Sequence, residues 1–425
     1  MQGFTDLMGA ASAGHIENVR RLLALGEDVN ARAGNGRTPL MYAATTGRSE
    51  EVVAALLDAG ADIDAQDVEG WTALMGAISF DLDAIARLLI IRGTNVNLAT
   101  KRGQVALQLA SAMGNSEMAR FLIASGADVG AERVDGFTVL MAAAQGNQLK
   151  LVQELVEVHG LDSHQKDDHQ WDALSYALEY GDLDLIEYLL KAGCDPTTID
   201  GDGLSPLMRM SKSGKVRNAE VLIEYGANVD QRTYDNMTSL LFAIDEGKTE
   251  VVDLLITQNA NLDLSRSDGL TPLMFATATE NPTAAQHLME AGANIHLSDE
   301  DGWNALLSAA SWGLSSVVDM LLTQGADIKS TRKDGYTLLM AAAVGGLTDI
   351  VKMCLDKGIE INAVDGENLT ALIYAAENGH LEICEILLES GADVSICDTD
   401  GRNAKDCAKD FNHTQIIELL DKYLE

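Results

Sequence analysis

The chain has 425 residues, of which 47% are hydrophobic and only 5% aromatic, and its formal net charge at pH 7 is -35. So acidic a protein repels phosphate backbones, which makes nucleic acid a poor partner and basic partners favourable. No apolar run approaches the roughly 20 residues of a membrane span, and the N-terminus lacks a secretory signal.

The five cysteines form no CxxC pair. This indicates reduced thiols and predicts a cytoplasmic protein. Export by a non-classical route is compatible with the same sequence.

One leucine recurs every 33 or 34 residues and defines a repeat. A small residue, almost always Ala, follows it three positions later. A leucine and a small residue on one helical face predict a helix that packs closely against its neighbours. Before the row breaks at Lys405, the repeat leucines are Leu7, Leu40, Leu74, Leu107, Leu140, Leu174, Leu207, Leu240, Leu273, Leu306, Leu339 and Leu372.

Each repeat also carries signals for where this first helix begins and ends. Two residues before the leucine stands a side chain that can cap a helix, usually Thr, and only Val105 breaks the row. Seven residues after the leucine, Gly or Asn predicts a left-handed helix end, while Asp81 and Glu280 depart from this rule. The Gly and Asn members are Gly14, Gly47, Gly114, Asn147, Gly181, Gly214, Gly247, Gly313, Gly346, Gly379 and Asn412.

The segments GRTPLMYAA (Gly36 to Ala44) and SGADVSICDTDGR (Ser390 to Arg402) resemble ankyrin repeats. The resemblance covers essentially the whole chain in about thirteen units. It implies an all-α solenoid of helix-turn-helix repeats joined by β-hairpin-like loops. We expect one array over residues 1–425, with an N-terminal cap at about 1–33 and a polar C-terminal cap at about 398–425.

The resemblance also implies a function. Members of this family are non-enzymatic scaffolds that bind a partner protein on the hairpin tips and on a concave groove lined by the first helices. We therefore expect a monomeric protein-binding scaffold without a cofactor. The alternative is a secreted effector, or an inhibitory or regulatory subunit, that uses the same surface.

Methionine often follows the repeat leucine directly, where the family usually has His. These methionines fill gaps in a buried core, or they form a Met-rich binding face. They are Met8, Met41, Met75, Met141, Met208, Met274 and Met340.

The sequence shows little sign of catalysis or of metal binding. His159, His164 and His169 lie near several aspartates, a composition that can bind zinc, but their spacing fits no compact finger. A solvated loop is the alternative, and the one we favour. No Walker, GxSxG, HExxH or EF-hand motif occurs. We expect no catalytic residue and no metal site.

Large apolar residues gather at two positions of the repeat. The hairpin position lies three residues before the repeat leucine, and the helix-end position lies six residues after it. In ankyrin repeats both positions face the groove, and aromatic anchors are typical of interaction hot spots. Packing between neighbouring hairpins is the alternative. The candidates are Trp71, Phe137, Trp171, Met237, Trp303 and Tyr336 at hairpins, and Phe80, Met113, Tyr180 and Trp312 at helix ends.

We expect three repeats to pair an aromatic hairpin residue with an aromatic helix end: Trp71 with Phe80, Trp171 with Tyr180, and Trp303 with Trp312. A small basic island is the other anomaly of this acidic chain. Arg209 and Lys212 lead it and could receive a carboxylate or phosphate. The alternative is a solvated helix. The charge balance predicts a basic or amphipathic partner segment.

Overall fold

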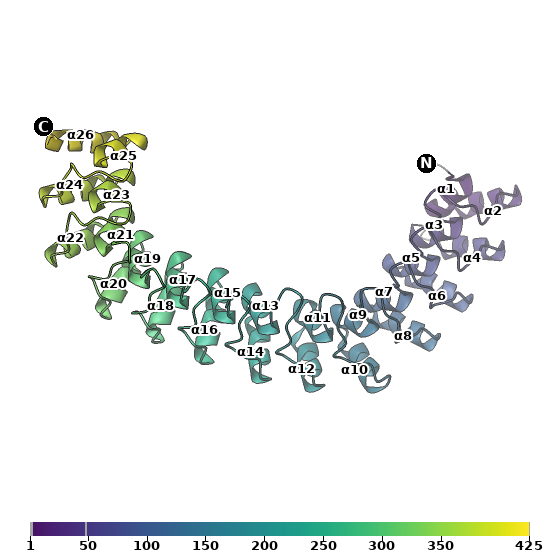
Figure 1. Ribbon diagram of the computed structural model, residues 1–425. Coiled ribbons are helices and arrows are strands. Elements are labelled where there is room, and N and C mark those ends of the chain that lie inside the picture. Colours follow the sequence, from purple (N-terminus) through teal and green to yellow (C-terminus); the bar gives the residue numbers. More distant parts are fainter. Residues whose placement is uncertain (1–2, 47–48, 425) are drawn as a thin grey trace. The chain divides into compact units, whose positions relative to one another are not determined.

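The computed structural model describes residues 3–46 and 49–424. These residues form helices joined by short loops, and the chain divides into two compact units, Met1–Pro206 and Leu207–Glu425. Figure 1 shows helix pairs following one another within each unit. The described part of the chain is all-α, with isolated β-bridges in some loops.

Each repeat contributes a first helix of seven or eight residues and a longer second helix. The first helices in the first unit are α1 (Asp6–Ala13), α3 (Pro39–Thr45), α5 (Ala73–Ser79), α7 (Ala106–Ala112), α9 (Val139–Gln145) and α11 (Ala173–Tyr180). Their second helices are α2 (Ile16–Ala24), α4 (Glu50–Asp58), α6 (Asp83–Ile91), α8 (Ser116–Ala124), α10 (Leu149–Glu157) and α12 (Leu183–Lys191).

The second unit continues the same order from α13, which begins at the last residue of the first unit. Its first helices are α13 (Pro206–Ser213), α15 (Ser239–Asp245), α17 (Pro272–Ala278), α19 (Ala305–Ser311), α21 (Leu338–Val344), α23 (Ala371–Glu377) and α25 (Ala404–Asp410). Its second helices are α14 (Val216–Glu224), α16 (Thr249–Thr257), α18 (Pro282–Glu290), α20 (Ser315–Thr323), α22 (Thr348–Asp356), α24 (Leu381–Glu389) and α26 (Thr414–Leu424).

The repeat leucines and the small residues after them form the core between successive first helices. Leu74 is 1% exposed and Ala77 is fully buried, and α5 packs against α3 and α7. The methionine row lies in the same core, since Met75, for example, is only 1% exposed. The gap-filling interpretation of these methionines is therefore correct, and a Met-rich binding face is wrong.

The helix starts confirm the predicted caps. Thr72 Oγ1 accepts the N–H of Met75 at 3.2 Å, as caps in other repeats do. Val105 cannot accept, and here Gln108 contributes instead. Its Oε1 accepts the N–H of Val105 at 3.2 Å, and its Nε2 donates to the carbonyl of Phe137 in the next repeat at 2.8 Å.

The helix ends depart from prediction at three residues. Asp81 and Glu280 also adopt the left-handed conformation, with φ of 56° and 51°, although the side chain of Glu280 disfavours it. Gly181 does not adopt it: its φ is -89°, because α11 runs to Tyr180 and the chain continues extended. Gly47 lies outside the described residues.

Successive loops are joined by a side chain ten residues before the repeat leucine, which we call the loop-link residue. Asn30 shows the full arrangement: its Nδ2 donates to the carbonyl of Gly60 at 3.1 Å, and its Oδ1 accepts the N–H of Asp62 at 2.7 Å. Asn97 makes the same pair of bonds, to Gly126 at 2.9 Å and from Asp128 at 2.8 Å. A carboxamide therefore fits between these loops as both donor and acceptor.

Four further loop-link residues make the accepting half of this arrangement. Each takes the N–H of the next loop at 2.8 to 2.9 Å. They are Asp64, Asp230, Asp263 and Asn362.

The strained helix end at Glu280 yields a stability prediction. Replacing Glu280 by Gly should raise the free energy of unfolding by about 1 kcal/mol, because glycine adopts a positive φ without a Cβ clash. Urea denaturation checks this. Gln286→Gly, inside α18, is the control and should lower the value by about 1 kcal/mol. Loss of stability in both variants would show that Glu280 bears no strain.

Candidate protein-binding surface

The four large apolar candidates at helix-end positions lie in solvent, and so does Phe411, which follows α25 and is 54% exposed. Phe80 and Met113 follow the neighbouring helices α5 and α7, and Tyr180 ends α11. Trp312 follows α19 in the second unit. Their exposed fractions are 59%, 47%, 54% and 51%, respectively. All four therefore offer free apolar area at one structural position.

Glycines keep the space beside two of these side chains open. Gly146 lies at the helix-end position after Met113, and a Cβ there would stand 2.0 Å from the carbonyl oxygen of Ser111. Gly345 follows Trp312 in the same way, with 1.9 Å to the carbonyl of Ala310. Neighbouring first helices approach too closely here for any side chain. Because Gly146 and Gly345 have no side chain, neither residue covers the neighbouring Met113 or Trp312.

The hairpin positions are less exposed than expected. Phe137 and Tyr336 are buried, at 5% and 6%, which corrects the expectation that they face solvent. Phe137 packs edge-on against Tyr176 of the next repeat, with ring centroids 5.1 Å apart, and Tyr336 packs the same way on Tyr374 at 5.6 Å. Packing between repeats, the alternative interpretation, explains both residues.

The other hairpin candidates are partly exposed: Trp71, Trp171, Trp303 and Met237 are each half-buried. Trp171 packs edge-on against Tyr176 at 5.2 Å, and Trp303 lies against Tyr336 at 5.8 Å. These rings therefore belong to aromatic clusters between repeats. The structure gives no ring contact between Trp303 and Trp312 among the described residues.

The sequence analysis missed the tyrosines that organise these clusters. Tyr176 and Tyr374 lie two residues after the repeat leucine, and each hydroxyl donates to a hairpin carboxylate, at 2.7 Å to Asp167 and 2.6 Å to Asp365. Burial and the neighbouring carboxylate raise the pKa of both tyrosines. They remain neutral donors. The same pattern occurs near the N-terminus, where Phe4 at a hairpin position contacts Tyr42, two residues after the next repeat leucine. The sequence could therefore have indicated this contact.

Arginines stiffen the same hairpins. The guanidinium of Arg332 lies 5.4 Å from the ring centre of Trp303 and 5.7 Å from that of Tyr336, and it pairs with Asp334 at 3.1 Å. Cation–π contacts of this kind contribute about 0.5–1 kcal/mol at exposed sites. The hairpin beside Trp303 is thus held in place by contacts within the chain.

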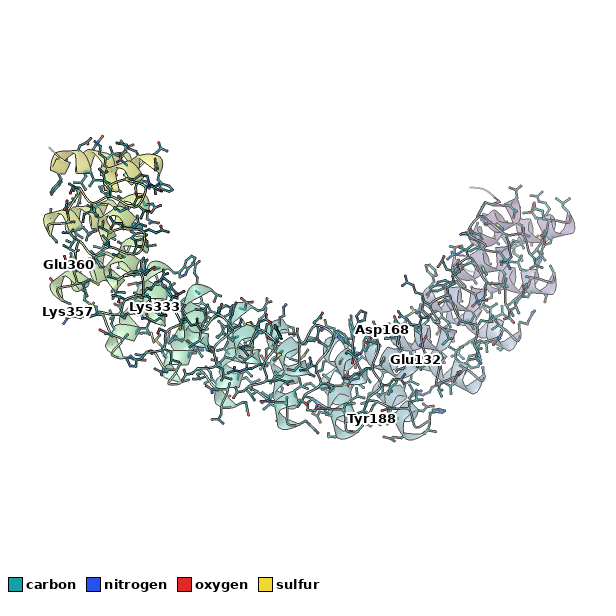
Figure 2. All side chains as sticks on the ribbon, viewed as in Figure 1. Glu132, Asp168, Tyr188, Lys333, Lys357 and Glu360 are labelled. Atoms are coloured by element: carbon teal, nitrogen blue, oxygen red, sulfur yellow. The ribbon has the colours of Figure 1, made fainter. Side chains whose placement is uncertain are left out.

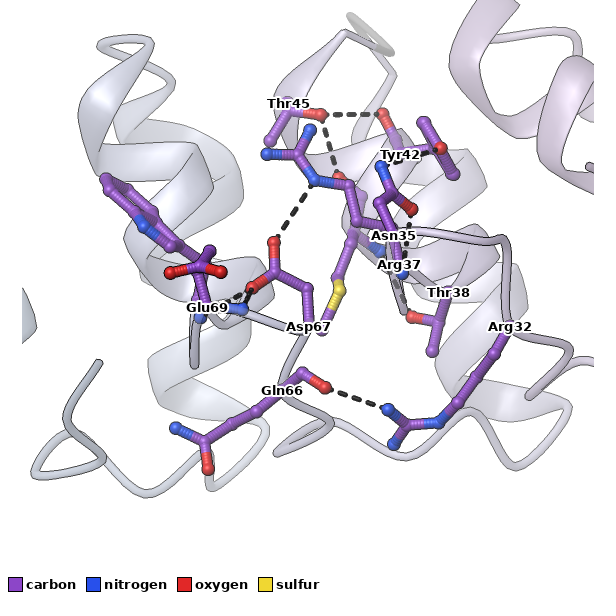
Figure 3. Close-up of polar contacts among 11 residues, drawn as sticks. Arg32, Asn35, Arg37, Thr38, Tyr42, Thr45, Gln66, Asp67 and Glu69 are labelled. Carbon is purple, nitrogen blue, oxygen red and sulfur yellow. Dashed lines mark hydrogen bonds and ion pairs between the residues drawn. The ribbon is translucent and has the colours of Figure 1, made fainter. Parts of the chain in front are cut away.

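In the first unit, polar contacts connect neighbouring hairpins (Figure 3). Arg37, at a hairpin position, reaches the carboxylate of Asp67 at 3.3 Å, and Arg32 donates to the carbonyl of Gln66 at 2.8 Å. The hairpin of one repeat is therefore fixed to the next by side chains on both arms.

The basic island is partly neutralised by acids. Lys212 is exposed on α13, and its Nζ lies 3.9 Å from the carboxylate of Glu246. Arg217 forms an ion pair with Glu220, and Arg209 is half-buried. An anionic ligand would have to compete with these carboxylates.

Four of the five thiols are buried. Burial raises the pKa of Cys194, Cys354 and Cys384 to about 12, and that of Cys407 to about 11. Thiolates, the reactive form of cysteine, are therefore scarce at these sites at neutral pH.

Of the histidines considered for zinc, His164 has an identifiable structural role. It occupies a loop-link position, where Nδ1 faces Asp162 at 3.0 Å and Nε2 faces the carbonyl of Gly193 at 2.9 Å. Both partners are acceptors, so only the doubly protonated ring satisfies both. Among the described residues, no group of three or more His, Cys, Asp or Glu side chains could hold a metal ion.

The loop link through His164 should depend on pH. Its contacts with the Gly193 carbonyl and with Asp162 raise its pKa above the usual 6.5. A raised folded-state pKa means that the stabilisation is complete below pH 6.5 and is lost as pH rises through the folded-state pKa. Asp172 is the other carboxylate whose charge raises this pKa.

The matched variant is His164→Asn, which places the carboxamide of Asn30 and Asn97 at this position. We expect the wild type to lose stability relative to the variant between pH 5.5 and 8.5, measured by urea denaturation at each pH. A pH-independent difference between the two proteins would rule out the imidazolium link.

The repeated helix pairs are matched by a known protein family. The family model of ankyrin repeats in three copies matches residues 7–100, 66–133, 107–200, 174–266, 246–332, 317–398 and 338–423. The chain belongs to the ankyrin repeat family. Ankyrin repeats are generally non-catalytic protein-interaction modules.

Several relatives share this repeat sequence. The chain is 31% identical over 228 residues to the putative ankyrin repeat protein YahD of Escherichia coli (strain K12), covering 52% of this chain and 96% of that protein. It is 30% identical over 251 residues to the ankyrin repeat and KH domain-containing protein mask-1 of Caenorhabditis elegans, covering 52% of this chain but 10% of that protein. Identity to Rabankyrin-5 of Homo sapiens is 30% over 165 residues, covering 38% of this chain and 14% of that protein.

The chain thus spans a small part of the two animal relatives. In the described ranges of this chain, no helix has both the length and the apolar content to cross a bilayer.

Proposed function

We propose that this chain is a non-catalytic scaffold that binds a partner protein on the surface formed by its first-helix ends and hairpins. The observation that carries the proposal is the recurrence of exposed Phe80, Met113, Tyr180 and Trp312 at one repeat position. Single exposed apolar residues are common on any protein surface, but Phe80 and Met113 stand at the same position of two successive, contacting repeats.

The chemistry of these side chains supports a protein partner. Aromatic residues and methionine are enriched at the centres of protein interfaces, where a few anchors contribute most of the binding energy. The hairpins beside them are already fixed by Arg332, Arg37 and the tyrosine clusters, so little conformational entropy is lost on binding. Trp71, Trp171, Trp303 and Met237 would contribute their exposed edges to this surface.

Charge supports a basic or amphipathic segment as the partner. The chain carries a net charge of -35, and the exposed Asp81 directly follows Phe80. Such a potential accelerates association with cationic segments at low salt. We propose a cytoplasmic monomer that acts in this way. An inhibitory or regulatory subunit would use the same face and would differ in the identity of its partner.

The helix-end residues of the first unit give the test. We expect replacement of Phe80, Met113 and Tyr180 by Ala to weaken partner binding at least tenfold, because each removes exposed apolar contact area. The measurement is the dissociation constant for a partner isolated on the immobilised wild-type chain. Stability should change by only about 0.5 kcal/mol, as is usual for surface sites.

The control variant replaces Leu25, Ile91 and Val158 by Ala. These residues lie at the ends of second helices and are 70%, 73% and 75% exposed. The two variants thus remove similar exposed apolar groups from different positions of the repeat. Equal weakening by both, or unchanged affinity in the helix-end variant, would contradict the proposed surface.

A further inference from the structure

At least three pairs of described loops lack this link: Gly130 has no side chain, and the side chains of His296 and Lys329 make no hydrogen bond to the following loop. Lys329 stands at the loop-link position between α20 and α21, and an ammonium group can donate but cannot accept. The bond that Asn30 takes from Asp62 therefore has no counterpart here. In the part of the chain that the structure describes, neither the N–H of Glu360 nor the side chain of Lys329 has a hydrogen-bond partner.

The unlinked groups are the ones that a carboxamide joins elsewhere. Gly358 and Glu360 occupy the places that Gly60 and Asp62 hold opposite Asn30, and Gly126 and Asp128 hold opposite Asn97. A carbonyl acceptor and an N–H donor are thus left two residues apart. Figure 2 shows Glu360 with Lys357, which follows α22.

A pocket of about 500 Å³ opens between these loops. Ile328, Ile359 and Val364 contribute its apolar lining, and Ser330 lies beside them. The hydroxyl of Ser330 is buried and has no hydrogen-bond partner among the described residues. Ile359 stands where most repeats have Ala, and its larger side chain adds to the apolar lining of this pocket.

We propose that this pocket binds a carboxamide flanked by aliphatic groups, namely an Asn or Gln side chain in an apolar segment of a partner protein. The carboxamide would donate to the carbonyl of Gly358 and accept the N–H of Glu360, as Asn30 and Asn97 do within the chain. The aliphatic neighbours would pack on Ile328, Ile359 and Val364. A pocket of this size with a few placed polar groups is typical of a binding site.

The Glu360 N–H and the Gly358 carbonyl together favour a carboxamide over a carboxylate or an aliphatic ligand. A carboxylate could accept from Glu360 and Lys329, but it would face the carbonyl of Gly358 without a proton and the nearby Glu360 side chain with like charge. A purely aliphatic segment would leave both backbone groups unsatisfied when it excludes water, which costs about 1–3 kcal/mol for each group.

The test uses three peptides and three proteins. The peptides are acetyl-Ala-Leu-Asn-Leu-Ala-amide and its counterparts with Asp or Leu in the centre. The proteins are the full chain, Lys329→Asn, which restores the internal link and fills the site, and Lys329→Ala, which leaves it open. Binding is followed by the chemical shift of the Glu360 backbone amide.

We expect the Asn peptide to shift this signal saturably, and to bind at least tenfold more tightly than the Asp and Leu peptides. Lys329→Ala should retain binding, and Lys329→Asn should abolish it while raising the midpoint of urea denaturation. Equal binding of the three peptides, no binding, or full binding by Lys329→Asn would overturn the proposal. The helix-end residues lie outside this pocket, so the proposed function can stand or fail separately.

Discussion

The close approach of successive first helices is the constraint on which the rest of the structure depends. Ala77 and most of its equivalents are fully buried, and at Gly76 a Cβ would stand only 2.5 Å from the side chain of Thr45. Little room for large side chains remains at these close contacts, although Met210 fits at the position equivalent to Ala77 in its own repeat. Phe80 and Trp312 lie at the ends of first helices and are exposed. The array thus combines close packing along its first helices with large apolar side chains exposed at their ends.

Each repeat is thin and is stabilised by contacts with its neighbours, which are made by the helices, the hairpins and the loops. The helices are joined by apolar packing, the hairpins by aromatic and arginine contacts, and the loops by the carboxamides and carboxylates of the loop-link row. Each of these interactions reaches the neighbouring repeat. Stability in such arrays is approximately a sum over neighbours. The absence of a link at Lys329 is therefore tolerated without loss of the fold.

Features that depend on contacts within one repeat could be predicted from the sequence, whereas features that depend on contacts between repeats could not. The caps at Thr72 and the buried Met75 depend on residues three positions apart or fewer, so the periodic sequence was sufficient. The burial of Phe137 could not be read from its own repeat, because it depends on Tyr176 in the next one. The end of α11 at Gly181 was missed because glycine permits a left-handed conformation without requiring it. The partners of the basic island likewise depend on neighbouring helices.

The buried cysteines have a consequence of a different kind. Cys354 and Cys384 are fully buried in neighbouring second helices, and Cys194 is 3% exposed after α12. Their high pKa and their burial protect them from alkylating reagents while their repeats are closed. Local opening of one repeat would expose one thiol and leave the others protected. The reactivity of each cysteine thiol would therefore report which part of the chain unfolds first.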